Sequence, residues 1–298
     1  MRKEKELLVD GKRLPVSNLD KIFYPKTGFT KGDVINYYIR IAPVLLPHLK
    51  DRPLTLKRYP NGVEGMFFYE KRCPTFRPAW LKTAPIWSEG NNEDINFCLA
   101  NDLPTLVWAA NLADLELHTY LGRAKTPLKP TMLVFDLDPG PGTGWKDVMA
   151  AARDVRERLS ALKLKSFLKT SGGKGLHVVL PIKSTRWEEA KAFTKTIAEA
   201  METDEPERYV STATKAKRNK RIFVDYLRNS REATAVAPYS TRARPGAPVS
   251  VPIDWPELGS LKAANQYTVK NLMQRLSRQQ KDPWAEIGRV KQSLPKLK

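Results

Sequence analysis

The chain has 298 residues, of which 41% are hydrophobic and 28% charged, and its 51 Lys and Arg against 32 Asp and Glu give a net charge of +19. This length allows a substantial core in one large or two modest domains, and no run approaches the roughly 18 apolar residues of a membrane span. The charge excess predicts a polyanionic partner, because contacts with phosphates release counterions; a solvated basic surface is the alternative.

The N-terminus and the cysteines bear on where the protein acts. The first residues, MRKEKELLVDG, carry charges but no apolar core with a cleavage site, so no secretory signal is predicted. Cys73 and Cys98 are not in CxxC spacing, which argues against a disulfide framework and a cysteine-built zinc site. We therefore expect two reduced thiols in a cytoplasmic, nucleoid-associated protein with no membrane partner.

The first half of the chain predicts one helix and a pair of strands. The helix begins after Thr30, an N-cap residue with Asp33 at the third helical position, and its apolar residues keep helical spacing. Pro43 is expected to bend or end this helix. Polar and apolar residues then alternate over 52–71 on both sides of a Pro-Asn-Gly turn, which predicts two strands.

The second half of the chain alternates strands and helices. Short apolar segments predict strands and amphipathic segments predict helices: strands at 131–138, 165–171, 175–181 and 221–227, and helices at 145–162 and 185–201. Residues 238–255 predict a loop or edge strands, and the region after Asn265 predicts a helix with a basic tail. This order predicts an α+β fold in which helices flank a mixed or antiparallel sheet.

Two acids interrupt an apolar strand in LVFDLDPGPG, residues 133–142. Successive strand residues point to opposite faces, so Asp136 and Asp138 project together. Two unpaired carboxylates this close repel each other, and burying them becomes acceptable when a divalent cation neutralises them. Asp225, alone in the apolar frame of RIFVDYL, is the expected third ligand if its strand lies beside the first. Three carboxylates can hold two Mg²⁺ or Mn²⁺ ions for phosphoryl or nucleotidyl transfer.

Two other interpretations of the acids stay open at this point. A DxD pair after an apolar strand also fits an aspartyl-nucleophile phosphatase, in which the first acid attacks phosphorus. Alternatively, Asp138 only caps the loop before Pro139.

The glycine-rich segment SGGKG, residues 171–175, is a candidate phosphate cradle. Its glycines let the backbone turn sharply and approach a ligand, while Ser171 and Lys174 offer a hydroxyl and an ammonium group to phosphate oxygens. A plain glycine hairpin is the alternative. His177, in the strand that follows, is a candidate donor to a triphosphate, with a structural role as the alternative.

Two basic segments follow. Arg242 and Arg244 in STRAR lie two residues apart and can reach one phosphate chain from one strand face. The run KAKRNKR, residues 215–221, immediately precedes the third acid. Its position favours contact with nucleotide or nucleic acid over a merely solvated face.

Taken together and in this order, FDLDPG, SGGKGLHVVLP, IFVDYLRN and PYSTRARPGAPVSVP closely resemble the polymerase domain of bacterial and archaeal DNA ligase D, in the archaeo-eukaryotic primase superfamily. The likeness includes SNLDKIFYPKTGFTKGDVINYY and KRYPNGVEG and covers about residues 17–255. It implies a primase-polymerase-like core and template-dependent nucleotidyl transfer. In that family the domain fills gaps and extends DNA ends in double-strand-break repair by non-homologous end joining, with a preference for ribonucleotides and often with Mn²⁺.

By matching motif, the resemblance assigns residues to four roles. The metal ligands are Asp136, Asp138 and Asp225. The contacts to the incoming triphosphate are Ser171, Lys174, His177, Arg218 and Arg242. The downstream 5′-phosphate is expected at Asn18, Lys21 and Lys31, the last at a helix N-terminus, which already favours an anion. The template-stacking candidates are Phe67 and Phe68, with core packing as the alternative.

The resemblance also implies an organisation and partners. One catalytic domain is expected over 1–298, with a DNA-end-binding part at about 1–125, a catalytic core at about 126–260 and a helical basic tail at about 261–298. The expected partners are gapped or broken DNA, NTPs, Ku and a DNA ligase. The zinc module of related primases and the ligase and phosphoesterase domains of a full ligase D have no counterpart in the sequence, and the Met1 start favours a separate polypeptide over an excised domain. A primase acting de novo and a non-catalytic module that bridges DNA ends are the alternatives.

Overall fold

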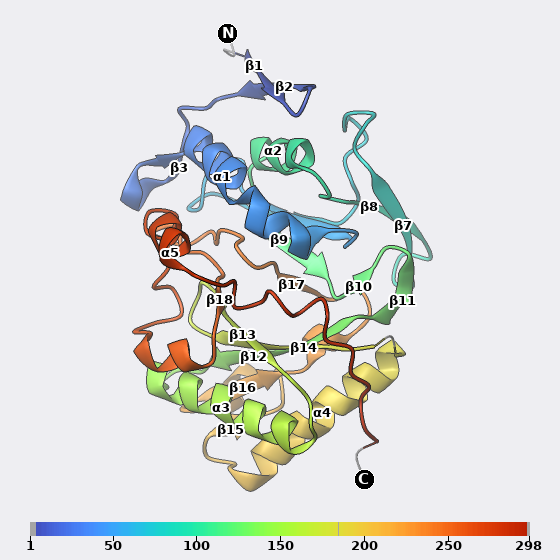
Figure 1. The fold of residues 1–298 in the computed structure, drawn as a ribbon, viewed down its shortest axis with the longest axis vertical. Helices are drawn as coiled ribbons and strands as arrows, with labels where there is room; N and C mark the ends of the chain where they lie inside the picture. The colour runs from blue at the N-terminus through green and yellow to red at the C-terminus, as the bar shows by residue number, and fades with distance from the viewer. Residues whose placement is uncertain (1–3, 184, 297–298) are drawn as a thin grey trace.

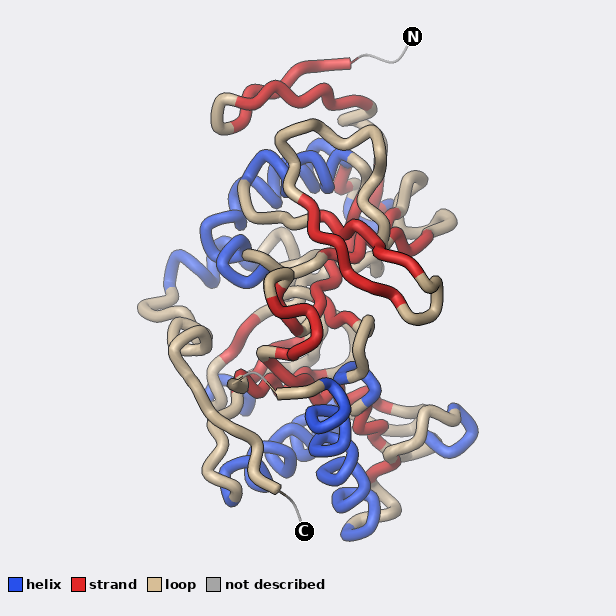
Figure 2. Tube along the Cα trace, turned by 90° about the vertical axis from the view of Figure 1, so that its right-hand side faces the viewer, coloured by secondary structure: helices blue, strands red, loops and turns tan. Residues whose placement is uncertain are grey.

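The computed structural model describes residues 4–183 and 185–296 and shows an α+β fold built on two large sheets. The α-helices of the described residues are α1 (Lys31–Leu49), α2 (Leu103–Asn111), α3 (Trp145–Ala161), α4 (Trp187–Asp204) and α5 (Leu272–Arg278). The two large sheets lie in the middle of the molecule, with α1 and α2 above them and α3 and α4 below, while β1 (Glu4–Val9) and β2 (Lys12–Ser17) lie above α1 and α2 (Figures 1 and 2). The predicted fold class is confirmed.

The lower sheet in Figure 1, here called the carboxylate sheet, has six strands. Their spatial order is β15 (Tyr209–Val210), β16 (Ile222–Asp225), β12 (Met132–Pro139), β14 (Leu176–Pro181), β13 (Phe167–Thr170) and β18 (Pro252–Ile253). All neighbours are antiparallel except β15 and β16, which are parallel. The four strands and two helices predicted in the second half of the chain are confirmed, and α3 and α4 pack on one face of this sheet.

The upper sheet, here called the N-terminal sheet, lies beneath α1 and α2 (Figure 1). Its order is β17 (Thr234–Val236), β9 (Asp114–Tyr120), β5 (Leu54–Arg58), β8 (Glu93–Cys98) and β7 (Thr83–Ser88), with β6 (Phe68–Glu70) paired to β5. The predicted strand pair around the Pro-Asn-Gly turn is confirmed as β5 and β6. Short two-stranded pairs complete the fold: β1 (Glu4–Val9) with β2 (Lys12–Ser17), β3 (Ile22–Tyr24) with β4 (Phe29–Thr30), and β10 (Gly122–Arg123) with β11 (Thr126–Pro130).

Helix α1 begins as predicted but continues past its prolines. Thr30 and Asp33 form a capping box, in which each side chain accepts from the backbone N–H of the other. Of the two effects expected of Pro43, a bend or an end of the helix, the end is wrong, because α1 contains both Pro43 and Pro47 and ends at Leu49. Both prolines face solvent, while the opposite face of the helix is fully buried. Packing of that apolar face outweighs the roughly 3 kcal/mol that an interior proline costs.

The C-terminal region is less helical than predicted. Helix α5 covers only Leu272–Arg278, and the described residues after it form turns and irregular chain. Pro283 and Pro295 remove backbone donors from this stretch. Trp284 instead anchors the segment, because its buried indole N–H donates to the carbonyl of Leu168 on β13 at 2.9 Å.

The expectation of two reduced thiols is wrong. Cys73 and Cys98 form a disulfide whose Cα atoms are 5.0 Å apart. The backbone N–H of Cys73 donates to Asn96 on β8 at 2.6 Å, so this segment runs beside the strand that carries Cys98. A separation of 25 residues gave no local sign of that pairing.

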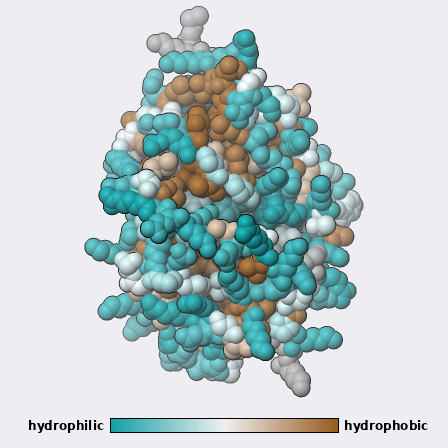
Figure 3. Space-filling view, in the orientation of Figure 1, coloured by the Kyte–Doolittle hydropathy of each residue, from teal (hydrophilic) through white to brown (hydrophobic). Residues whose placement is uncertain are grey.

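The surface matches the charged composition. The face in Figure 3 is mostly hydrophilic, with one apolar area over α1 and α2. Among the residues that the structure describes, no helix combines the length and the apolar character needed to cross a bilayer.

Candidate active site

The alternation of β12 turns its two acids away from α3 and α4. Three apolar residues of β12 pack in the core against these helices: Leu133, Phe135 and Leu137. Asp136 and Asp138 therefore project from the opposite face, which packs toward the N-terminal sheet. Asp136 lies directly opposite Asp225 on β16 and opposite His177 on β14. The register of β12 and β16 thus places Asp225 beside Asp136, as the sequence predicted.

Asp136 uses both carboxylate oxygens. Its Oδ1 is 3.2 Å from Nε2 of His177, and its Oδ2 is 3.3 Å from Nε of Arg228. The same Nε is 3.2 Å from Oδ2 of Asp225. Burial alone would raise the pKa of Asp136, but His177 and Arg228 outweigh it and hold that pKa well below its usual range. Because burial and the nearby Lys169 lower the pKa of His177 to about 4, the ring is neutral at pH 7 and its contact with Asp136 is a hydrogen bond.

The other two carboxylates are crowded. The charge of Asp136 raises the pKa of Asp138 to about 7, with burial and Asp225 adding to the effect and Arg228 opposing it. Burial also raises the pKa of Asp225, again against the charge of Arg228. Arg228 and Arg218 offset part of the repulsion among the three acids, and a further cation would relieve the rest.

The donor set fits a hard divalent ion, although the side chains enclose none as they stand. Within residues 4–183 and 185–296, no group of three or more His, Cys, Asp or Glu is arranged to hold a metal. The Nε of Arg228 instead contacts one oxygen of Asp136 and one of Asp225. Carboxylate oxygens are the ligands that Mg²⁺ and Mn²⁺ prefer, so the chemistry of Asp136, Asp138 and Asp225 fits such ions.

The SGGKG segment closes β13 onto β14 as a tight loop. The Oγ of Ser171 accepts from the backbone N–H groups of Gly173 and Gly175, both at 3.1 Å. Gly172 has φ +68°, and a Cβ there would lie 2.8 Å from Cγ of Arg242, so only glycine fits without strain. The segment is a tight glycine hairpin, and as the loop stands the N–H groups of Gly173 and Gly175 are used by the serine hydroxyl and are not free for a phosphate.

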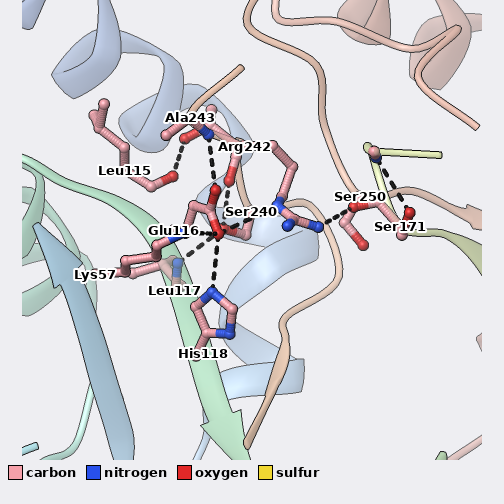
Figure 4. Close-up of polar contacts among 12 residues, drawn as sticks. Lys57, Leu115, Glu116, Leu117, His118, Ser171, Ser240, Arg242, Ala243 and Ser250 are labelled. Carbon is pink, nitrogen blue, oxygen red and sulfur yellow. Dashed lines mark hydrogen bonds and ion pairs between the residues drawn. The ribbon is translucent and has the colours of Figure 1, made fainter. Parts of the chain in front are cut away.

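Arg242 joins this loop to the N-terminal sheet (Figure 4). One of its terminal nitrogens donates to the carbonyl of Ser171 at 2.5 Å, and its Nε lies 3.3 Å from Glu116 of β9. The remaining donors to this buried carboxylate are Ala243 N–H at 3.0 Å, His118 Nε2 at 3.0 Å and Lys57 Nζ at 3.4 Å. Burial favours protonation of Glu116, but the hydrogen bond from His118 and the charges of Arg242 and Lys57 hold its pKa well below the usual range.

The remaining nucleotide-site candidates differ in their surroundings. Arg218 donates to the carbonyl of Ala213 at 2.7 Å and lies 3.9 Å from the ring centroid of Phe223, which is opposite Asp138 in the β12–β16 register. Arg218 is therefore beside the acids, as predicted. Lys174 is exposed in the loop between β13 and β14.

The three predicted 5′-phosphate residues form one backbone cluster. The N–H of Lys21 donates to Asn18 at 3.0 Å, and the N–H of Lys31 donates to Lys21 at 2.8 Å. The ammonium group of Lys21 is exposed and held by the carbonyl of Pro60 and the Oδ1 of Asn61, both at 2.7 Å. Lys31 is the first residue of α1 and is buried.

Phe67 and Phe68 are 50% and 43% exposed, so core packing does not explain them. Phe67 stacks on Tyr59 with ring centroids 5.2 Å apart, and Nζ of Lys57 lies 4.6 Å from the Phe67 centroid. The guanidinium of Arg58 lies 5.1 Å from the Phe68 ring. An exposed aromatic surface beside cations is suited to stacking bases.

The sequence prediction missed three residues of this site: Glu116, His118 and Arg228. The first two lie in DLELHTY, where polar residues alternate within an apolar strand, the same signal that identified Asp136 and Asp138. Arg228 follows Asp225 by three residues, and a short turn can bring such neighbours together. This spacing was a local signal for the ion pair between them.

Comparisons with known proteins identify the family of the chain. A family model described as the LigD primase-polymerase domain matches residues 30–284. The multifunctional non-homologous end joining protein LigD of Pseudomonas aeruginosa is 36% identical over 282 residues, covering 94% of this chain and 33% of that protein. The bifunctional protein LigD of Bacillus subtilis is 30% identical over 269 residues, covering 90% and 43%. The chain thus spans between a third and a half of the length of these relatives.

A solved structure extends the likeness to three dimensions. The polymerase domain from Mycobacterium tuberculosis Ligase D, in complex with DNA, matches with a TM-score of 0.81 and 34% sequence identity, covering 89% of this chain and 95% of that one. The resemblance predicted from the four motifs is confirmed. The chain belongs to the LigD primase-polymerase domain family and is a nucleotidyltransferase.

Proposed function

We propose that this chain is a template-dependent polymerase that fills gaps and extends broken DNA ends in non-homologous end joining, with a preference for ribonucleotides. The observation that carries the proposal is the register of β12 and β16, which sets Asp136 against Asp225 on the same face as Asp138. The relatives' names place them in end joining, and the matched structure is a complex with DNA. Ku and a DNA ligase are the partners that this role requires.

The proposed chemistry is attack of a primer 3′-hydroxyl on the α-phosphorus of an NTP, which forms a phosphodiester bond, breaks the bond from the α-phosphorus to the bridging oxygen and releases pyrophosphate. Asp136, Asp138 and Asp225 would hold two Mn²⁺ or Mg²⁺ ions, which lower the pKa of the hydroxyl and neutralise the triphosphate. The chain itself supplies fixed donors for the charge that develops on the phosphates.

Those donors surround the SGGKG loop. The hydroxyl of Ser171 has its oxygen committed to two loop N–H groups, which leaves its O–H free to donate. Lys174 brings an exposed positive charge, Arg218 is held by Ala213 and Phe223, and Arg242 is fixed by Glu116. The neutral ring of His177 donates from Nε2 to Asp136, so its buried Nδ1, which has no hydrogen-bond partner in the described part of the chain, is an acceptor. His177 would donate to a phosphate only with a protonated ring.

Asn18, Lys21 and Lys31 are proposed to bind the 5′-phosphate of the downstream strand, with Phe67 and Phe68 stacking on the template. The ammonium group of Lys21 suits a phosphate contact, because it is exposed to solvent and two oxygens hold it in place. Lys31 is the first residue of α1, where the partial positive charge of the helix dipole favours an anion.

We predict that Lys21→Ala and Lys31→Ala each reduce the advantage of a 5′-phosphorylated gap about tenfold, since a charge-assisted contact is worth roughly 1.5–3 kcal/mol. The measurement is single-nucleotide incorporation on gapped duplexes with and without the phosphate. Lys26→Ala, an exposed lysine of the same segment, is the matched control. A parent protein that treats both gaps alike would contradict the pocket.

The proposed function is tested by extension of a gapped, 5′-phosphorylated duplex, comparing rNTP with dNTP and Mn²⁺ with Mg²⁺. We expect templated incorporation, faster with rNTPs. Synthesis on unprimed single strands would instead indicate a primase. Tight binding of DNA ends without any incorporation would indicate a bridging module.

A further inference from the structure

Arg228 occupies the position between two of the acids that a metal ion would need. Its Nε is 3.3 Å from Oδ2 of Asp136 and 3.2 Å from Oδ2 of Asp225. We propose that Arg228 is an internal counter-cation, which holds these carboxylates together before metal binds and competes with divalent ions for them. The inference rests on the proposed function, because it assumes that these acids bind metal.

The remaining oxygens of both acids are already committed. Oδ1 of Asp136 faces His177 at 3.2 Å, and Oδ1 of Asp225 accepts from the backbone N–H of Leu227 at 2.8 Å. The two oxygens left over are the two that converge on Arg228. A cation that bridges Asp136 and Asp225 through these Oδ2 atoms would use the same oxygens that the guanidinium now contacts.

The backbone of the turn that carries Arg228 is held to β12, whereas the side chain of Arg228 is partly exposed. Arg228 lies in a 3₁₀ turn, Leu227–Asn229. The side chain of Asn229 pairs with β12 as a peptide group would, accepting from Val134 N–H and donating to Val134 C=O, both at 2.8 Å. The Arg228 side chain is nevertheless 44% exposed. The turn thus delivers the guanidinium to the acids, while close to half of the side chain stays open to solvent.

Guanidinium and metal cannot share the site. Mg²⁺ binds carboxylate oxygens at about 2.0–2.1 Å, and two cations within a few ångströms in a poorly hydrated site repel by several kcal/mol. Binding of the ion therefore displaces Arg228, and the cost of breaking its two contacts lowers the affinity for metal. The displaced side chain keeps its charge beside the site, because its backbone stays anchored to β12.

The test is Mn²⁺ affinity without nucleotide, measured by the electron paramagnetic resonance signal of free Mn²⁺ on the parent, Arg228→Gln and Arg228→Lys. We expect Arg228→Gln to bind Mn²⁺ about tenfold more tightly, which is 1.4 kcal/mol, with Arg228→Lys between the two. Without metal, the Tm of Arg228→Gln should fall below that of the parent, and saturating Mn²⁺ should close the gap.

Arg231→Gln is the matched control. Arg231 is on the same segment but pairs with Glu89 and the carbonyl of Trp87, so its loss should leave Mn²⁺ affinity unchanged. Unchanged or weaker binding in Arg228→Gln overturns the competition while leaving the proposed function intact. The metal site of the proposed function fails if the parent binds no Mn²⁺, or if Asp138→Asn leaves the bound Mn²⁺ in place. In either case this inference fails with it.

Discussion

Replacing Asp138 with Asn should lower nucleotide incorporation about 10³-fold or more without weakening the fold. The loss follows because one anionic ligand of the proposed ions is gone, and about 4 kcal/mol of transition-state stabilisation corresponds to 10³ in rate. Steady-state incorporation on a primed template measures this, and a gel shift should show DNA binding within about twofold of the parent.

The stability of the same variant makes the prediction stricter. In the metal-free chain the pKa of Asp138 is raised to about 7, above its unfolded value of about 3.9. Stability therefore falls as pH rises from about 4 to about 7, because the folded state binds more protons than the unfolded state. Asp138→Asn removes that loss and should be at least as stable as the parent at pH 7.5 without metal, by thermal or denaturant unfolding.

The matched control is Asp94→Asn, which removes an equal charge from an exposed position. It should leave both incorporation and stability unchanged. An Asp138→Asn protein that incorporates nucleotides within tenfold of the parent would remove Asp138 from the reaction centre. A variant that is inactive but also unfolded would contradict the account of carboxylate crowding.

Replacing Glu116 with Gln should cost about 3 kcal/mol or more of unfolding free energy at neutral pH. Glu116 is buried among Arg242, His118 and Lys57, and removing one partner of a buried ion pair leaves the others uncompensated. Denaturant unfolding gives the free energy. Glu64→Gln, at an exposed position, is the control and should change it by less than about 0.5 kcal/mol.

The pH dependence identifies the cause. The pKa of Glu116 is depressed in the fold, so its stabilisation is present above the unfolded pKa of about 4.3 and is lost as pH falls through the folded value. The difference between parent and Glu116→Gln should therefore shrink below about pH 4. A difference that stays constant down to pH 2 would assign the loss to packing and not to charge.

Glu116→Gln should also raise the KM for NTP, because Arg242 would lose its anchor beside Ser171. A double-mutant cycle with Arg242→Gln should show coupling of about 1 kcal/mol or more, since the two side chains are in contact. Additive effects on KM would mean that Glu116 stabilises the sheet without positioning Arg242.

The common face of Asp136 and Asp138 was predictable because it depends only on the alternation of side chains along one strand. Period-two alternation put Asp136 and Asp138 on one side of β12, and the single acid in the frame of β16 pointed to the third. The capping box of α1 was predictable for the same reason, since Thr30 and Asp33 are three residues apart.

The features that sequence reasoning missed depend on distant contacts. Glu116 meets Arg242 across 126 residues and Cys73 meets Cys98 across 25, and no periodicity reports such meetings. Helix α1 does not end at Pro43, because burial of its opposite face in the core stabilises the helix beyond this residue. The C-terminal helix was overestimated because Trp284 gains a buried site on β13 that an isolated amphipathic pattern does not reveal.

The claim on which this account depends is that Asp136, Asp138 and Asp225 form one divalent-cation centre facing the nucleotide. Crystals of the chain grown with Mn²⁺ and a non-hydrolysable NTP, measured at the manganese absorption edge, address it directly. The account predicts anomalous density within coordination distance of all three aspartates, with the Arg228 guanidinium withdrawn from Asp136 and Asp225. Manganese bound elsewhere, or three aspartates still paired with Arg228 at saturating Mn²⁺ and nucleotide, would contradict it.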